Sequence, residues 1–155
     1  MYKVVFVCTG NTCRSPMAEA LFRAMLEERG LQDRIIVSSA GIYAFEGDEA
    51  SPFAAEVMEK EYGIDLKPHR ARVLYDDDIR DASLILVMTK RHRDMITDIY
   101  PDAESKVHLL KEYAGLHEDT DVIDPYGHDY NTYKRCAREL EDLLLAALDR
   151  MIESM

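Results

Sequence analysis

The residues with the clearest chemical meaning lie in one short segment near the amino terminus, Cys8-Thr9-Gly10-Asn11-Thr12-Cys13-Arg14-Ser15-Pro16. The segment follows an apolar run and precedes a stretch of helical periodicity, so we predict that it forms a strand-to-helix turn. Such a turn points successive backbone N–H groups and a helix amino terminus at one place, which makes an anion-binding site. A cysteine at the mouth of that site is favoured as a thiolate, and a thiolate is a nucleophile.

Arg14 and Ser15 extend this chemistry. Five residues separate Cys8 from Arg14, enough for the guanidinium to curl back over a bound anion and donate two hydrogen bonds to its oxygens. Ser15 can donate its hydroxyl proton to the Cys8 sulfur and stabilise it when it leaves. Gly10 permits close backbone approach or a positive φ, and Asn11 tolerates the left-handed region. Together these residues predict a phosphate-binding loop with a cysteine nucleophile.

Short apolar runs alternate along the chain with longer stretches of helical spacing, which is the pattern of βαβ units. We predict strands at 4–7, 35–37, 83–88 and 106–110. Ser15 is expected to cap a first helix that has Pro16 at its first position and ends at Gly30. Further helices are predicted from Pro52 to about Tyr62, from Asp76, over 90–100, and along an apolar stripe from Tyr133 to Met151.

This order predicts one α/β domain over residues 1–155, with a four-stranded parallel sheet, helices on both faces and the phosphate loop after the first strand. In such sheets ligands bind beyond the carboxyl ends of the strands, which again points to the segment from Cys8 to Ser15.

Composition excludes several classes of partner. Nineteen Lys and Arg against thirty Asp and Glu give a net charge of −11, which repels nucleic acid and anionic membrane surfaces. Three cysteines, without an export signal, predict a reducing cytoplasmic location and no disulfide framework. The five histidines show no metal-ligand spacing, so we expect no metal and no cofactor. For the oligomeric state, a monomer is the default expectation.

Three segments resemble a known family. The run from Val7 to Glu19 resembles the signature of the low-molecular-weight phosphotyrosine phosphatases, and Asp124-Pro125-Tyr126 resembles that family's general-acid loop. Ser39-Ala40-Gly41 extends the match. In that family the cysteine attacks phosphorus, the arginine binds the equatorial oxygens, and the aspartate protonates the leaving group and then activates water.

The resemblance implies two-step hydrolysis of phosphorylated proteins through a phosphocysteine, without a cofactor. It carries the catalytic roles to Cys8, Arg14 and Asp124. Substrate binding is predicted for the remaining loop residues and for one aromatic residue beside the acid: Thr9, Gly10, Asn11, Thr12, Cys13, Ser15 and Tyr126.

Thr12 bears on the choice of substrate. Tyrosine-specific members carry a larger aliphatic residue there, and threonine resembles the bacterial protein-arginine phosphatase branch, as do Thr89 and Lys111-Glu112-Tyr113. A small hydroxyl side chain leaves room beside phosphorus and offers a polar contact to a guanidinium nitrogen. The stretch from Glu112 to Tyr133 holds six acids and no Lys or Arg, which predicts either a negative rim for a guanidinium substrate or a solvated loop. We therefore predict phosphoarginine, with phosphotyrosine as the alternative.

Other uses of the thiols remain open. The resemblance implies reversible oxidation between Cys8 and Cys13, while a small side chain packed under the loop is the alternative for Cys13. Cys136 is expected to be a packed helix residue, so arsenate reduction by a cysteine relay is not favoured. A thiol-disulfide oxidoreductase and a silent phosphoresidue-binding module are the alternatives from other classes. The presence of both Cys8 and Asp124 argues against the silent module.

Overall fold

Four parallel strands form the centre of the molecule, in the order β2-β1-β3-β4. They are β1 (Tyr2–Cys8), β2 (Ile35–Gly41), β3 (Leu84–Val87) and β4 (Val107–Leu109). The computed structural model describes all residues from 1 to 155 and has the single α/β domain and four-stranded parallel sheet that the sequence predicts. All carboxyl ends of the strands therefore lie at one edge of the sheet, where the first strand ends in Cys8.

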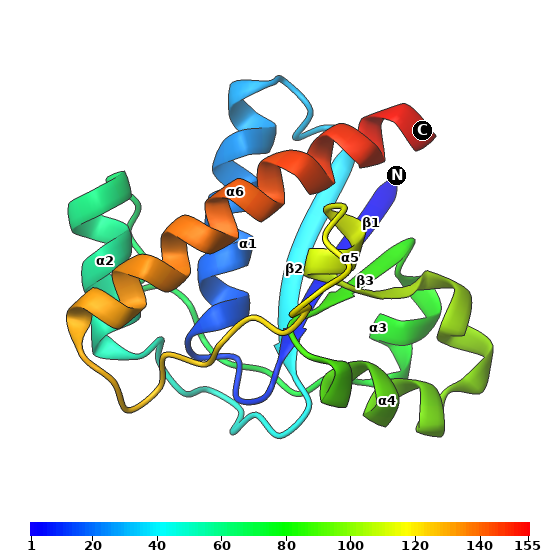
Figure 1. Cartoon of the computed structure of the whole chain (residues 1–155), viewed down its shortest axis with the longest axis horizontal. Helices are drawn as coiled ribbons and strands as arrows, with labels where there is room; N and C mark the ends of the chain where they lie inside the picture. Colours follow the sequence, from blue (N-terminus) through cyan, green and yellow to red (C-terminus); the bar gives the residue numbers. More distant parts are fainter.

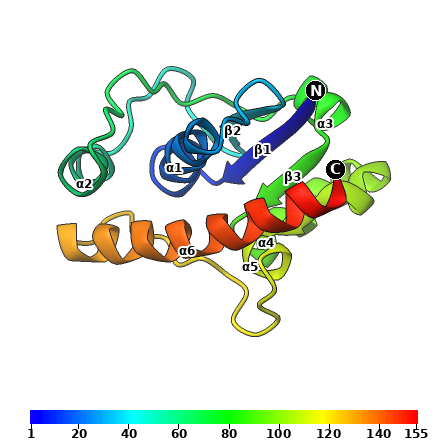
Figure 2. The same cartoon turned by 90° about the horizontal axis from the view of Figure 1, so that it is seen from above.

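Six helices and one 3-10 turn connect and cover the strands (Figures 1 and 2). They are α1 (Arg14–Glu28), α2 (Pro52–Tyr62), α3 (Asp76–Asp81), α4 (Lys90–Ile99), η1 (Pro101–Lys106), α5 (Leu110–Tyr113) and α6 (Tyr130–Ser154). The long helix α6, orange to red in Figure 1, crosses α1 and also packs on α2.

The core lies on both faces of the sheet, because side chains of β1 alternate between them. Val4 and Phe6 belong to the larger apolar cluster, which α1, α2 and α6 complete. Val5 and Val7 belong to a smaller cluster that includes Ile79 of α3. Burial on both faces is typical of a central parallel strand and holds the end of β1 rigidly.

Local signals set most of the helix boundaries. Helix α2 starts at Pro52 after Ser51 and ends at Gly63, whose φ of 66° is left-handed, as predicted. Helix α1 differs: it begins at Arg14, with Cys13 at the N-cap position, so the prediction that Ser15 caps this helix is wrong. The Ser15 hydroxyl instead bonds to side chains of the preceding loop.

The bounds of all four strands also differ from prediction, by one to four residues at an end. Strand β2 continues past Val37 to Gly41, because each of its residues pairs with β1 up to the pair Cys8 and Gly41. Small and polar residues in 38–41 hide this extension from an apolar pattern. Strand β4 ends at Leu109, and Leu110 already begins α5.

Candidate active site

Cys8 lies at the carboxyl end of the central strand. Its side chain is buried, and its Sγ lies 2.8 Å from the Ser15 Oγ in the first turn of α1. Because a hydroxyl can donate to sulfur at this distance, Ser15 is placed to stabilise a Cys8 thiolate. The helix amino terminus next to it favours negative charge at the same place.

Asn11 fixes the shape of the loop between Cys8 and Ser15. It is fully buried and has a φ of 57°, so it adopts the left-handed conformation that the sequence allowed at this position. Its Nδ2 donates to Ser15 Oγ at 2.8 Å and to Ser39 Oγ at 2.9 Å. Its Oδ1 accepts from the Arg72 N–H at 3.0 Å, and its carbonyl oxygen lies 2.8 Å from His69 Nε2. These bonds hold the strained turn from behind.

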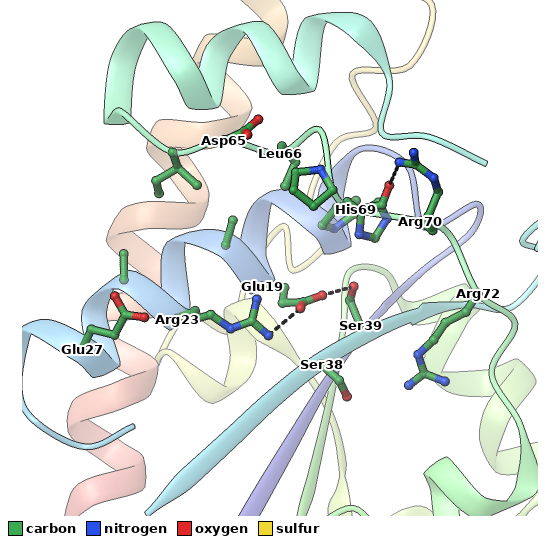
Figure 3. A pocket seen from close by; sticks show the side chains of 15 residues that line it. Glu19, Arg23, Glu27, Ser38, Ser39, Asp65, Leu66, His69, Arg70 and Arg72 are labelled. Atoms are coloured by element: carbon green, nitrogen blue, oxygen red, sulfur yellow. Dashed lines mark hydrogen bonds and ion pairs between the residues drawn. The ribbon is translucent and has the colours of Figure 1, made fainter. Parts of the chain in front are cut away.

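Behind the loop, a cavity of about 560 Å³ lies between α1, β2 and residues 64–72. Figure 3 shows Glu19 between Ser39 and Arg23, which both donate to it. Glu19 thereby fixes the Ser39 hydroxyl that binds Asn11. Within this cavity Arg23 pairs with Glu19, while Arg72 pairs with Asp78 of α3. We therefore interpret the bonded side chains that line this cavity as support for the loop.

Gly41 is a supporting residue that no local pattern indicated, apart from its place in one segment of the family resemblance. A Cβ at this position would lie 2.6 Å from the Thr9 carbonyl oxygen and 3.0 Å from the Asn11 nitrogen. Both atoms are backbone atoms of the phosphate loop, so any side chain here would push the loop out of place. Gly10, in contrast, has no positive φ, and a Cβ there would make only an ordinary contact, 3.7 Å from Thr12 Oγ1, so neither role predicted for this glycine is seen.

Arg14 joins the loop to the segment that carries the predicted acid. Its side chain is buried, its Nη1 donates to the Val122 carbonyl oxygen at 2.9 Å, and its Nη2 lies 3.6 Å from Asp124 Oδ2. Its buried Nε has no hydrogen-bond partner within the protein. The guanidinium is therefore held in place and keeps donor capacity for an oxyanion.

Asp124 and Tyr126 face the loop from the segment between α5 and α6. The side chain of Asp124 is about half exposed at 49%, and its Oδ1 accepts the Tyr126 N–H at 3.1 Å. Both residues line one cavity of about 500 Å³ together with Cys8 and Arg14. Its other walls include four further residues predicted to bind substrate, Thr9, Gly10, Thr12 and Cys13, and the exposed Tyr43.

The structure thus brings the predicted site residues together, in two layers. The predicted nucleophile, the arginine, the predicted acid and most loop residues line the cavity, while Asn11 and Ser15 lie behind the loop and hold it. No group of three or more His, Cys, Asp or Glu side chains is arranged as a metal site.

Of the two expectations for the acidic stretch, the structure favours a solvated loop over a negative rim, because most of these acids are exposed and lie away from the cavity. Of the six acids between Glu112 and Tyr133, only Asp124 lines the cavity. Asp121 instead accepts the Lys90 N–H at the start of α4. Two other carboxylates, Asp48 and Glu49, come from the loop between β2 and α2. No motif in the sequence indicated these two residues, because only the fold brings that loop to the cavity.

Thr89 and Lys111, which resembled the arginine branch, have structural positions. Thr89 is the N-cap of α4 and accepts the His92 N–H. Lys111 donates to the carbonyl oxygen of Asp119 and pairs with Glu139. Neither residue lines the cavity.

The other two thiols are also free and buried. Cys13 Sγ lies 3.3 Å from Ser51 Oγ and 3.4 Å from the Tyr133 hydroxyl. Cys136 packs against the carbonyl oxygen of Ile123, and burial raises its pKa to about 12. An inert, packed Cys136 agrees with the sequence interpretation.

A thiol, a guanidinium and a carboxyl group thus meet at the edge of a parallel sheet, around a loop built to bind an anion. The class of protein that this fold and site define is the cysteine-dependent phosphatases. The family model described as low molecular weight phosphotyrosine protein phosphatase matches residues 3–154. The chain belongs to this family.

Individual relatives agree with the family. A protein-arginine-phosphatase of Geobacillus stearothermophilus is 42% identical over 154 residues, which cover 99% of this chain and 96% of that protein. A low molecular weight protein tyrosine phosphatase from T. tengcongensis has a TM-score of 0.89 and 43% identity, with 100% of both chains covered. The YwlE arginine phosphatase, solved as a cysteine-to-serine mutant with a phosphorylated active-site serine, has a TM-score of 0.90 and 40% identity, with 97% of this chain and 95% of that chain covered.

Proposed function

We propose that this protein removes phosphate from phosphoarginine side chains of proteins, through a phosphocysteine on Cys8. The observation that carries the choice of substrate is Thr12, whose side chain lies in the wall of the cavity that holds Cys8. Relatives named for arginine phosphatase activity, at 42% and 40% identity, support the same choice. Phosphotyrosine is the second candidate, because the exposed aromatic rings of Tyr43, Phe45 and Tyr126 at the cavity also suit a phenyl ring.

The geometry supports a first step in which Cys8 accepts the phosphoryl group. The thiolate attacks phosphorus, so an S–P bond forms while the P–N bond to the arginine side chain breaks. Arg14 and the loop N–H groups bind the non-bridging oxygens, where charge accumulates. Asp124 donates its proton to the departing nitrogen.

The second step restores the enzyme. The Asp124 carboxylate takes a proton from a water molecule, and the oxygen of that water molecule attacks phosphorus. The S–P bond breaks and inorganic phosphate is released. Ser15, 2.8 Å from the sulfur, stabilises the departing thiolate with its hydroxyl proton.

The substitution Thr12→Ile tests the substrate preference. We expect the unmutated protein to have a higher kcat/KM on a phosphoarginine peptide than on the same peptide with phosphotyrosine. In Thr12→Ile this ratio should fall by about 10-fold or more, because the larger apolar side chain fills the space beside phosphorus and removes the hydroxyl. The measurement is kcat/KM for both peptides and both proteins.

Thr12→Val serves as the matched control, because it keeps the branched shape and removes only the hydroxyl. A smaller change in Thr12→Val than in Thr12→Ile would assign the effect to volume. If the unmutated protein prefers phosphotyrosine, the second candidate replaces the first, and the roles of Cys8, Arg14 and Asp124 stay as proposed.

The substitution Asp124→Asn tests the proposed acid and base. We expect kcat to fall by about 10²- to 10⁴-fold, which is the usual contribution of general acid–base catalysis. One limb of the pH dependence of kcat should disappear as well, because asparagine does not titrate. The measurement is the pH–rate profile of both proteins on one substrate, and an unchanged profile would remove Asp124 from the mechanism.

We also propose that Cys13 protects Cys8 by reversible disulfide formation. Both thiols line the same cavity, although Cys13 also contacts Ser51 and Tyr133. A disulfide would stop further oxidation of Cys8 to sulfinic acid. We expect Cys13→Ser to recover less activity than the unmutated protein when dithiothreitol follows peroxide treatment. Equal recovery would leave Cys13 as a packing residue.

We also propose that the protein is cytoplasmic and monomeric. Three free thiols suit a reducing compartment, and one chain supplies every residue of the cavity. No helix of the chain has the length and apolar character needed to cross a membrane.

A further inference from the structure

A buried histidine contacts the phosphate loop and has no role in the two steps above. His92 lies in the first turn of α4 and is only 4% exposed. Its Nε2 lies 2.9 Å from the Oγ1 of Thr9, the residue that follows the nucleophile. Its Nδ1 is buried and has no hydrogen-bond partner within the protein.

These contacts define the protonation state of the ring. A buried N–H without an acceptor is rarer than a buried acceptor without a donor, so we assign Nδ1 as the unprotonated nitrogen. In this tautomer the proton is on Nε2, which donates to Thr9 Oγ1. Burial first, and then the nearby Arg14, lower the pKa of His92 to about 4, against the opposing effect of Asp121 and Asp124. The ring is therefore neutral at pH 7.

The position of His92 is set by the strand next to β1. Strand β3 pairs with β1, and the Met88 N–H continues that pairing by donating to the Val7 carbonyl oxygen. Thr89 follows and accepts the His92 N–H at 3.2 Å, which caps α4 and fixes its first turn. Thr89 thus has a defined part in the site although it does not touch the cavity.

Thr9 is held from two directions. Its carbonyl oxygen accepts the Tyr43 N–H at 2.9 Å, and the Cys8 carbonyl oxygen accepts the Ile42 N–H at 3.1 Å, both from the residues after β2. His92 holds the side chain of Thr9 from α4. The bonds to Asn11 support the second part of the loop, so His92 provides the side-chain support of the first part.

We propose that His92 is a positioning residue for catalysis, whose Nε2–H holds Thr9 so that the loop N–H groups beyond Cys8 keep the geometry that binds the transferred phosphoryl group. Donors fixed in advance contribute most where charge develops in the transition state. The effect should therefore fall on kcat more than on KM. This inference rests on the proposed phosphatase function of the Cys8 site.

The test compares two substitutions of His92 with opposite expectations. In His92→Phe the ring shape is kept and the hydrogen bond is lost, so we expect kcat to fall by about 10-fold, the order of one lost hydrogen bond. In His92→Gln the amide nitrogen replaces Nε2 as a donor to Thr9, and kcat should stay within about 3-fold of the unmutated protein. Inhibition by inorganic phosphate should weaken in His92→Phe and recover in His92→Gln.

Thr9→Val supplies an independent arm of the test. It removes the hydroxyl that His92 binds, so it should reproduce the loss of kcat, and the double variant with His92→Phe should lose no more than either single variant. His108, half-buried on β4 and packed on Tyr113, offers the matched control, and His108→Phe should leave kcat unchanged.

The outcomes separate this proposal from the proposed function. Rates are measured on phosphoarginine and phosphotyrosine peptides and on an aryl phosphate. If the proposed substrate is wrong, the rates of the unmutated protein alone will show it. The effects of the substitutions are measured relative to the unmutated protein on each substrate. Equal losses in His92→Phe and His92→Gln, or additive losses with Thr9→Val, would overturn the positioning role. If His92→Phe does not fold, the comparison of His92→Gln with Thr9→Val decides: matching losses contradict the proposal.

Discussion

Replacement of Cys8 by serine is expected to lower kcat by at least about 10⁴-fold, on the scale seen when a catalytic nucleophile is removed. The Ser15 hydroxyl still lies beside the new side chain, but a serine hydroxyl is not ionised at neutral pH and attacks phosphorus slowly. If it does accept a phosphoryl group, the product persists, because an alkoxide leaves phosphorus much less readily than a thiolate does. Rapid-quench kinetics and intact-protein mass after incubation with substrate measure both effects.

The same substitution should leave the fold nearly unchanged. Serine is close to cysteine in size, so we expect the free energy of unfolding to change by about 1–2 kcal/mol at most, although the site is buried. Affinity for inorganic phosphate, measured by calorimetry, should persist because the loop N–H groups and Arg14 remain. Cys136→Ser is the matched control and should retain kcat; substantial turnover by Cys8→Ser would reject Cys8 as the nucleophile.

Arg14→Lys is expected to lower kcat/KM by about 10²- to 10³-fold, as the loss of a charge-stabilising donor does in other enzymes. Lysine keeps the charge but cannot present two parallel donors to a planar pair of oxygens. The substitution also removes the donor to the Val122 carbonyl oxygen. Because Arg14 is buried, we expect the free energy of unfolding to fall by about 1–3 kcal/mol as well.

Kinetics and urea denaturation of Arg14→Lys measure the two losses separately. The control is Arg29→Lys, since Arg29 forms an exposed ion pair with Asp149 at 2.8 Å. Exposed pairs contribute about 0–1 kcal/mol, so this variant should match the unmutated protein in both measurements. An Arg14→Lys protein with full activity would show that a point charge is sufficient and that the fork geometry is not required.

The sequence by itself predicted the chemistry of the loop and determined the architecture of the sheet, which the structure confirms. Apolar runs that alternate with stretches of helical spacing predicted four parallel strands. A continuous apolar run and a helical period are both visible in the order of neighbouring residues, so no tertiary information was needed. Cys8 and Arg14, where α1 begins, are also close in sequence, so their spacing alone indicated an anion site. Ser51-Pro52 and Gly63 set the ends of α2 by local backbone preference.

The tertiary structure decided which residues complete the site. Cys13, and not Ser15, occupies the N-cap position of α1, and the Ser15 hydroxyl bonds to Cys8 and Asn11 instead. Strand β2 continues to Gly41 because its pairing with β1 outweighs the weak apolar pattern of residues 38–41. The absence of a side chain at Gly41 leaves room for the loop.

Contacts between residues that are far apart in the sequence complete the rest of the site. Thr9 meets His92 across 83 residues of sequence, and Arg14 reaches Val122 across 108. Asp48 and Glu49 join the cavity through a loop with no motif of its own. No local pattern encodes such contacts, since they depend on how the sheet and its crossovers bring distant segments together. The physical reason is that chemistry follows from residue type, whereas position follows from packing of the whole chain.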